Sequence, residues 1–335
     1  MQDLTTLLLA WYDKHGRQMP WRFRGKAPDP YPVWVSEIML QQTTVATVYD
    51  YFLRWMEKFP TLKSLADAPL DDVLHAWQGL GYYTRAKKMH ECAKVLIEKY
   101  NGQFPCVREE LLKLPGIGPY TASSICAFAF NLPETVVDGN VIRVIARLYG
   151  LTQEVDKDTI YPMACQLTSK THGADYASAI MDLGATVCKP QNPLCDVCPW
   201  RTACLAYQQK LQNQIPLIRK TQKRKAKGSV FLAFDDQNRV MLTKRDSGLL
   251  SGLWEFYWLL DGNTPPFTAH WIKTGKSVHH VFTHIDFTGD IYIAKGVSSQ
   301  QGLFVKLDDL SNYALSTLMK KVLKTIKNHE NSVAD

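Results

Sequence analysis

Four cysteines near the middle of the chain constrain its fold more than any other feature. They are Cys188, Cys195, Cys198 and Cys204, in the segment CKPQNPLCDVCPWRTAC. Six, two and five residues separate successive cysteines. A structural zinc site usually joins two close cysteine pairs, whereas one C-x-x-C between two longer arms suits a thiolate cage for a 4Fe-4S cluster. The spacing therefore favours an iron–sulfur cluster, with zinc and unrelated cysteines as the alternatives.

Length and composition predict a globular protein with two domains. Of the 335 residues, 46% are hydrophobic and 21% charged, as in ordinary proteins that build their own cores. No apolar run approaches the roughly 20 residues that span a bilayer, and the N-terminal sequence reads as a helix rather than a signal peptide. Four further cysteines are expected to be small buried hydrophobes in a reducing cytosol. They are Cys92, Cys106, Cys126 and Cys165.

The net charge of +7 is concentrated in one stretch that contains no acid. Its basic residues are Lys210, Arg219, Lys220, Lys223, Arg224, Lys225 and Lys227. Removing these seven from the 39 basic residues leaves 32, which equals the number of acids. The stretch predicts an interdomain linker over residues 208–228, which is either simply solvated or lies along the phosphates of a nucleic acid.

Residues 1–207 read as helices joined by short loops. Leu70, Leu74 and Trp77 recur at helical spacing after a proline suited to a first turn. A second apolar stripe runs over residues 86–100 and ends at a glycine. This part of the chain is predicted to be an all-α domain.

Beyond the basic stretch the apolar period changes from 3.6 to 2. Residues 230–234 and 240–242 alternate on either side of the turn sequence DDQN, which predicts a hairpin. A second strand pair is expected over residues 285–293, turning at a glycine. Residues 315–326 place their apolar side chains on one face of a closing helix. We therefore expect an α+β domain over residues 229–330.

Three segments of the helical domain carry residues suited to chemistry. In LPGIGPYTA, Gly116 and Gly118 permit a tight turn whose amides could bind phosphate at a helix N-terminus, although a lone G-x-G is usually only a turn. In VVDGNVIRV, Asp138 stands just before a helical pattern, where it would at least be an N-cap. Glu37 lies among apolar residues in VWVSEIMLQQTTV, and a buried carboxyl with a raised pKa suits general acid catalysis.

Together these segments resemble a known family. The motifs VWVSEIMLQQT, GLGYYTRA, LPGIGPYTA and VDGNVIRV, the dipeptide at Pro20 and Trp21, and the cysteine spacing are similar to those of the MutY-type adenine DNA glycosylases, which are helix-hairpin-helix iron–sulfur enzymes. The second domain matches more weakly, through RDSGLLSGLWEF and HHVFTH. The resemblance implies an all-α helix-hairpin-helix domain with a 4Fe-4S cluster, followed by an α+β Nudix-like domain.

The resemblance also implies a reaction, hydrolysis of the glycosidic bond of adenine mispaired with 8-oxoguanine in double-stranded DNA after the adenosine is flipped out. Glu37 matches the acid that protonates adenine N7. Asp138 matches the carboxylate that stabilises or captures the oxocarbenium ion, and Tyr120 and Asn140 match residues that assist around the sugar. These roles follow the two-carboxylate logic of glycosidases.

Tyr120 also bears on what happens after the base leaves. In the related endonuclease III class this hairpin position carries a lysine that forms a Schiff base, which a phenol cannot form. The resemblance therefore implies a monofunctional glycosylase that leaves an abasic site in base excision repair. The alternatives are an endonuclease III-like lyase and a DNA-binding or redox-sensing iron–sulfur protein without catalysis.

Further residues match the family's DNA and lesion contacts. Those in the helical domain are Gln42, Thr43, Leu80, Tyr82, Gly116 and Gly118, of which Gln42, Leu80 and Tyr82 would wedge into the duplex. The C-terminal loop of Phe282, Thr283 and His284 would read 8-oxoguanine. No glutamate occurs between Glu255 and Glu330, so this domain is expected to recognise the lesion rather than to bind Mg²⁺ and hydrolyse nucleotides. The alternative to a lesion-reading role is that Thr283 is simply a strand threonine and His284 a surface histidine.

Three departures from the family pattern affect these expectations. Phe-Thr-His replaces the usual Phe-Ser-His, so Thr283 could crowd the lesion and weaken discrimination against guanine. Ser178 stands where a glutamine or glutamate usually helps to hold adenine. The stretch 22–30 is a few residues longer than is typical of the family, which leaves the match of Arg17 or Arg22 to an adenine-side arginine open. We expect a monomer without a membrane partner, in the cytoplasm and associated with the bacterial nucleoid.

Overall fold

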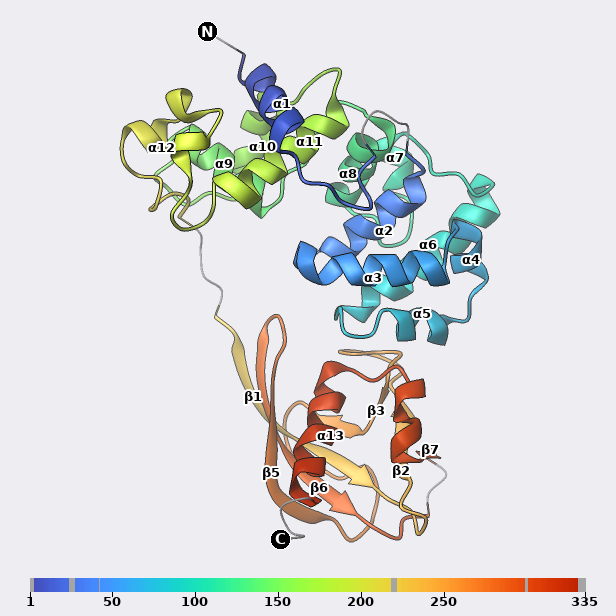
Figure 1. Ribbon diagram of the computed structural model, residues 1–335. Helices are drawn as coiled ribbons and strands as arrows, with labels where there is room; N and C mark the ends of the chain where they lie inside the picture. The colour runs from blue at the N-terminus through green and yellow to red at the C-terminus, as the bar shows by residue number, and fades with distance from the viewer. Residues whose placement is uncertain (1–2, 24–27, 42, 218–221, 299–300, 331–335) are drawn as a thin grey trace. The chain divides into compact units, whose positions relative to one another are not determined.

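The structure is a computed structural model and describes all residues except 1–2, 24–27, 42, 218–221, 299–300 and 331–335 (Figure 1). The chain forms two compact units. The first contains residues 1–67 and 91–220, and the second contains residues 68–90 and 221–335. Among the described helices, none is both long enough and apolar enough to cross a membrane.

The first unit is built from helices and short turns. Its helices are α1 (Leu4–His15), α2 (Pro30–Leu40), α3 (Val45–Lys58), α4 (Leu62–Asp67), α7 (Arg108–Leu111), α8 (Pro119–Phe130), α9 (Gly139–Leu148), α10 (Lys157–Leu167), α11 (Gly173–Asp182) and α12 (Leu205–Gln208). A π-helical turn, η1 (Leu183–Val187), continues α11, and two 3₁₀ turns follow, η2 (Cys195–Val197) and η3 (Arg201–Ala203). One core gathers α1, α9, α10 and α11 around residues such as Leu8, Ile145 and Ile180.

Local sequence explains where the helices of this unit begin and end. Asp29 caps α2, accepting a hydrogen bond from the Tyr31 amide, and a proline occupies the first turn. Asn131 ends α8 in the left-handed conformation, with φ of 53°. The two helices predicted around residues 70–77 and 86–100 are confirmed as α5 (Leu70–Ala76) and α6 (Tyr83–Tyr100), which passes from the second unit into the first.

The remaining part of the second unit contains two sheets and a closing helix. The four-stranded sheet has the order β4 (Tyr257–Leu259), β1 (Arg224–Ala233), β6 (Ile285–Ala294) and β5 (Ile272–Val281). The three-stranded sheet has the order β3 (Trp254–Glu255), β2 (Val240–Lys244) and β7 (Leu303–Val305). A 3₁₀ turn, η4 (Leu307–Asn312), leads to α13 (Thr317–Glu330), whose apolar face joins the core between the sheets. The predicted all-α domain followed by an α+β domain is thus confirmed.

The second predicted hairpin was wrong, and the first is confirmed only at its turn, where the Asp235 amide donates to the Arg239 carbonyl at 3.1 Å. β1 lies between β4 and β6 as a central strand and shares only the isolated bridge Phe234–Val240 with β2, which belongs to the other sheet. Gly289 does not turn the chain but lies inside β6, where it pairs with Gly228 and Val278. A Cβ atom on Gly289 would lie 2.6 Å from the Phe287 ring, so this glycine is required for close packing. The alternation of apolar and polar residues shows which face of a strand is buried, but it does not show which strand lies beside it.

Two expected boundaries and the expected burial of one cysteine differ from the structure. β1 already begins at Arg224, so the basic residues from 224 to 227 belong to a strand rather than to the linker 208–228. Residues 68–90, expected in the first domain, group with the C-terminal part, and the Gln78 amide there donates to the Leu315 carbonyl at 2.9 Å. Cys106 is exposed, contrary to the expectation of a buried thiol, because it lies in the loop between α6 and α7.

Candidate active site

A cleft of about 770 Å³ opens in the first unit and brings the four predicted catalytic residues together. Its walls come from α2, α8, α9, α11 and the segment that precedes α2. Residues predicted from the sequence that line it are Glu37, Thr43, Tyr120, Asp138, Asn140 and Ser178. These side chains come from segments up to 141 positions apart in the sequence, so the fold rather than local sequence assembles the cleft.

Glu37 projects from the apolar helix α2 and is only 8% exposed. Burial raises its pKa to about 7, and the negative charge of Asp138 adds to the increase. Hydrogen bonds from Ser124 and Tyr120 and the positive charge of Arg22 oppose it. The expectation of a buried carboxyl with a raised pKa is confirmed, and Glu37 therefore holds a proton in about half of the molecules near neutral pH.

Tyr120 lies in the first turn of α8, directly after the glycine hairpin. Burial, followed by the nearby charges of Glu37 and Asp138, raises its pKa well above the ordinary value, so the phenol stays neutral. Gly116 has a φ of 75°, which permits the tight turn, and Gly118 is the N-cap of α8. The Lys157 ammonium lies 5.4 Å from the centroid of the Tyr120 ring, a contact that the sequence analysis missed.

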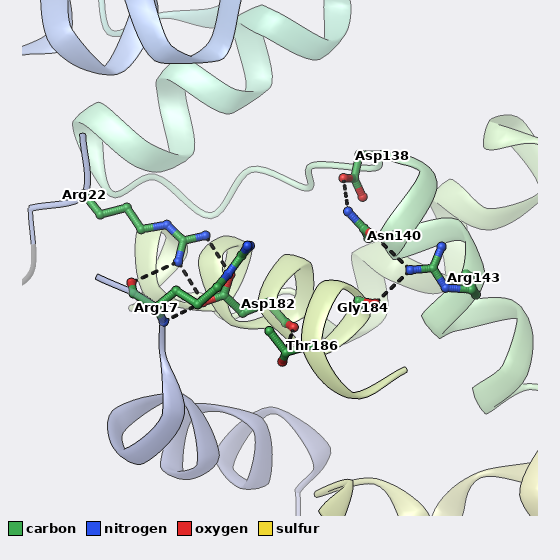
Figure 2. A network of polar contacts seen from close by, with 8 residues as sticks. All are labelled: Arg17, Arg22, Asp138, Asn140, Arg143, Asp182, Gly184 and Thr186. Carbon is green, nitrogen blue, oxygen red and sulfur yellow. Dashed lines mark hydrogen bonds and ion pairs between the residues drawn. The ribbon is translucent and has the colours of Figure 1, made fainter. Parts of the chain in front are cut away.

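Asp138 is both an N-cap and a wall of the cleft. Its Oδ1 accepts the Val141 amide at 2.8 Å, and its Oδ2 accepts the Asn140 amide group at 2.9 Å. Arg143 then donates to Asn140 Oδ1 and to the Gly184 carbonyl, each at 2.8 Å (Figure 2). Both carboxylate oxygens are therefore fixed in place by hydrogen bonds.

An ion-pair network that the sequence analysis missed forms the opposite wall of the cleft. Arg17 and Arg22 both bond to Asp182 at the end of α11, and the Asp182 side chain is completely buried (Figure 2). The only sequence signal was an acid at the end of the otherwise apolar pattern YASAIMD. Ser178 lies one turn earlier on α11, is 5% exposed and also lines the cleft. The two arginines therefore belong to one site, which their sequence alone left open.

The cysteine segment packs against the core of the first unit. Cys188 follows η1, and Cys195, Cys198 and Cys204 flank the two 3₁₀ turns, as expected for an irregular wrap. Burial raises the pKa of Cys198 to about 12, and the charges of the other three cysteines add to it. The four thiols therefore lie close enough to affect one another. Among the described residues, no group of three or more histidine, cysteine or acidic side chains is arranged to hold a single metal ion.

Arg147 supports the cysteine segment from inside the core, although it is only 2% exposed. Its guanidinium donates to Cys188 Sγ at 3.3 Å and to the Lys189 carbonyl at 2.6 Å. The Cys204 thiol donates in turn to the Arg147 carbonyl at 3.3 Å. A buried cation beside sulfur atoms suits thiolates, whose negative charge it would balance. The sequence analysis missed this residue because its helix reads as a plain amphipathic pattern.

Two of the predicted wedge residues, Leu80 and Tyr82, and the predicted lesion loop 282–284 lie in the second unit. Tyr82 is 40% exposed and has a φ of 50°, an uncommon conformation for a residue other than glycine, whereas Leu80 is buried. The Tyr82 hydroxyl is hydrogen-bonded to that of Thr283. Phe282 stacks on Trp258 with 6.0 Å between ring centroids.

His284 is exposed in the same loop as Phe282 and Thr283. Gln42 lies outside the described residues.

Two segments of the chain match two protein families. Residues 35–163 match the HhH-GPD superfamily of base excision DNA repair proteins, and residues 229–325 match the NUDIX domain. The chain is 34% identical to an adenine DNA glycosylase of Mus musculus, over 96% of this chain and 77% of that protein. It is 31% identical to an adenine DNA glycosylase of Buchnera aphidicola subsp. Schizaphis graminum, over 96% of this chain and 98% of that protein.

Two solved structures resemble the chain over about three fifths of its length. A thermostable thymine-DNA glycosylase is 27% identical with a TM-score of 0.56, covering 61% of this chain and 95% of that one. A non-covalent endonuclease III–DNA complex is 25% identical with a TM-score of 0.53, covering 63% of this chain and 98% of that one. The helical fold is therefore shared with a thymine-DNA glycosylase and with an endonuclease III.

Proposed function

The chain belongs to the family of adenine DNA glycosylases, and we propose that it removes adenine paired with 8-oxoguanine, and also adenine paired with guanine. Removal of adenine from DNA in base excision repair is the function that its relatives support. The finer proposal adds the mispair, a monofunctional reaction that leaves an abasic site, and a monomeric enzyme acting on DNA in the bacterial nucleoid. The observation that carries it is a buried carboxyl of raised pKa beside a second, hydrogen-bonded carboxylate in one cleft.

The proposed reaction begins when adenosine leaves the base stack and enters the cleft. Protonated Glu37 donates its proton to adenine N7, which makes the base a better leaving group. The bond between C1′ and N9 then breaks, and the electron pair leaves with the base. Asp138, held by two hydrogen bonds, stabilises the positive sugar or captures it at C1′ before water adds. Tyr120 and Asn140 orient the sugar and the two carboxyl groups.

A lyase reaction is the second candidate, because one observation bears on it. Tyr120 cannot form an imine, but the Lys157 ammonium approaches its ring at 5.4 Å. Attack of this amine on C1′ of the ring-opened abasic product, with loss of water, would give a Schiff base, and elimination of the 3′ phosphate would then break the strand. Lys157 does not line the cleft, whereas the two carboxyl groups do. The hydrolytic, monofunctional reaction is therefore the one that we propose.

We also propose that Cys188, Cys195, Cys198 and Cys204 hold one 4Fe-4S cluster. The donor set fits, since four mutually interacting thiols surround an irregular loop and the buried Arg147 cation bonds to one sulfur. When bound, the cluster would supply four iron–thiolate bonds that cross-link residues 188–204. In this role it is structural, and it would hold Lys189 and Arg201 toward DNA phosphates.

The second unit is proposed to recognise the lesion. Tyr82 is exposed, adopts an uncommon backbone conformation and bonds to Thr283, which fits a wedge that works together with the loop 282–284. Leu80 and Gln42 are proposed to assist the wedge, and Thr43, Gly116 and Gly118 to contact the DNA backbone. His284 is exposed in the same loop, where it can reach a base.

One assay tests the proposed function. A duplex with a single adenine opposite 8-oxoguanine is incubated with the enzyme and resolved with and without alkali. Adenine release with strand breaks only after alkali supports the proposal. Breaks without alkali that disappear in Lys157→Ala would assign the lyase, and an intact base after prolonged incubation would assign a non-catalytic DNA-binding protein.

A further inference from the structure

We propose that Asp182 is a positioning residue of the cleft, which holds the guanidinium groups of Arg17 and Arg22 in its wall and, by balancing the charge of Arg22, sets how readily Glu37 keeps its proton. This inference rests on the proposed role of Glu37 as the acid. Asp182 itself does not line the cleft, so it acts only through the two arginines.

Asp182 is the shared acceptor of both arginines. Its Oδ1 accepts Arg17 Nε at 2.7 Å and Arg22 Nη2 at 2.9 Å, and its Oδ2 accepts Arg22 Nη1 at 2.7 Å. The Arg17 backbone amide donates to Oδ2 at 2.9 Å. One completely buried carboxylate thus fixes a main chain and two side chains that come from a segment about 160 positions earlier.

The charges in this network are unequal. Burial raises the pKa of Asp182, but hydrogen bonds from Arg22 and Arg17 outweigh that effect, so its net pKa is below the ordinary value and the group stays ionised. One negative charge therefore faces two positive charges, whose side chains are 29% and 15% exposed. Without Asp182, both guanidinium groups would face the cleft without a counter-charge.

Arg22 connects this network with Glu37. The charged and titratable groups that face Glu37 are Arg22 from the segment before α2, Tyr120 from α8 and Asp138 at the start of α9. Arg22 carries the positive charge in this group and favours the carboxylate of Glu37 through it, whereas Tyr120 does so through a hydrogen bond. Asp182 fixes the Arg22 guanidinium in a bidentate pair. Asp182 therefore fixes the position of the Arg22 charge relative to Glu37 and balances part of that charge.

The backbone at Asp182 is also built for this position. The α-helix α11 ends there and continues as the π-helical turn η1, and the Thr186 hydroxyl donates to the Asp182 carbonyl at 2.8 Å. Two residues later the Gly184 carbonyl accepts Arg143, which holds Asn140 (Figure 2). The junction between α11 and η1 thus supports both walls of the cleft, and π-helical turns are frequent at functional sites.

The test compares pH profiles of single-turnover adenine release. Glu37 must be protonated to act, so activity falls as pH rises through its pKa. Asp182→Asn leaves Arg22 unbalanced and stabilises the Glu37 carboxylate, so the alkaline limb should move to lower pH by roughly half a unit or more. Arg22→Gln should move it to higher pH. The double variant should match Arg22→Gln, because Asp182 acts through Arg22.

Two variants control for a merely structural effect. Asp182→Glu keeps the negative charge, so the alkaline limb of its pH profile should lie at the wild-type position even if the rate is reduced. Asp235→Asn removes a comparable carboxylate, which bonds to the side chain and the amide of Arg239 in the second unit, and should leave the profile unchanged. The proposal would be overturned if Asp182→Asn lowered the rate of adenine release without moving the alkaline limb of the pH profile. It would also be overturned if the alkaline limb of the double variant differed from that of Arg22→Gln.

A second readout does not depend on activity. Isotope-edited infrared spectroscopy of labelled glutamate, with Glu37→Gln as the reference, follows the titration of Glu37 in the protein without DNA. If the wild type releases no adenine, the proposed function fails, while this titration still tests the role of Asp182. If Asp182→Asn does not fold, the position of the Glu37 titration in Arg22→Gln and Asp182→Glu decides, and an unmoved value in Arg22→Gln contradicts the proposal.

Discussion

The cleft of the first unit and the loop 282–284 of the second unit differ in how their polar groups meet solvent. Glu37 in the cleft and Asp182, which holds two arginines of its wall, are buried, and charged neighbours shift the pKa of each. In the second unit, Thr283 and His284 are exposed. Burial changes proton affinity, which acid catalysis requires, whereas exposure leaves groups free to contact a base. The proposed function therefore assigns chemistry and recognition to different parts of the chain.

The largest expected effect is that of Glu37→Gln. The amide cannot donate the proton that adenine needs, so the single-turnover rate should fall by about 10³-fold, while affinity for the mispair changes little. Glu255→Gln is the matched control, because Glu255 is equally buried but bonds to Arg245 and Trp258 in the second unit. Equal losses of rate in both variants would contradict the separation of chemistry from recognition.

The pH dependence of the wild type should also distinguish the two regions. Since the pKa of Glu37 is about 7, the rate of adenine release should fall about tenfold for each pH unit above that value, or roughly 100-fold by two units. Binding to an 8-oxoguanine duplex that carries a non-cleavable adenine analogue should stay nearly constant over this range. Rapid-quench rates and fluorescence anisotropy measure the two. A rate that is flat from neutral pH upward would refute Glu37 as the acid.

The sequence predicted the cleft better than it predicted the sheets. Apolar neighbours such as Trp34 and Ile38 indicated that Glu37 is buried, and the position of Asp138 before a helix indicated its cap. Such features depend on neighbouring residues alone. Asp182 was missed because its partners lie 160 or more positions away. Pairing between distant residues is set by the whole fold, which local patterns do not contain.

The same limit explains the errors in the second unit. β1 and β6 run parallel over ten residue pairs although 51 residues separate their ends, so no short turn could have indicated the pairing. Gly289 suggested a turn in the sequence, but a glycine is needed there because the ring of Phe287 leaves no room for a Cβ atom. The resemblance identified the loop 282–284 by its sequence motif, whereas no periodicity pointed to it.

A smaller effect is expected from Tyr82→Ala. An aromatic side chain that stacks on bases contributes about 1–3 kcal/mol, so affinity for the mispair should fall roughly tenfold while the rate at saturating enzyme falls less. Tyr161→Ala is the control, since that side chain is 37% exposed compared with 40% for Tyr82 but lies on α10. Binding titrations of both variants give the comparison. Similar losses would indicate that any exposed tyrosine has this effect and would argue against a wedge.

The smallest expected effect is that of Thr283→Ser, which tests whether the exposed loop alone sets lesion preference. The serine keeps the hydroxyl that bonds to Tyr82 but removes a methyl group that would crowd 8-oxoguanine. One methyl group changes discrimination by roughly 1–3 kcal/mol at most in a closed pocket, and an exposed loop can relax. The ratio of affinities for 8-oxoguanine and guanine mispairs should therefore rise only about threefold, with no change in the pH profile set by Glu37. A shifted profile would mean that the loop and the cleft are coupled, and the separation between the two regions would fail.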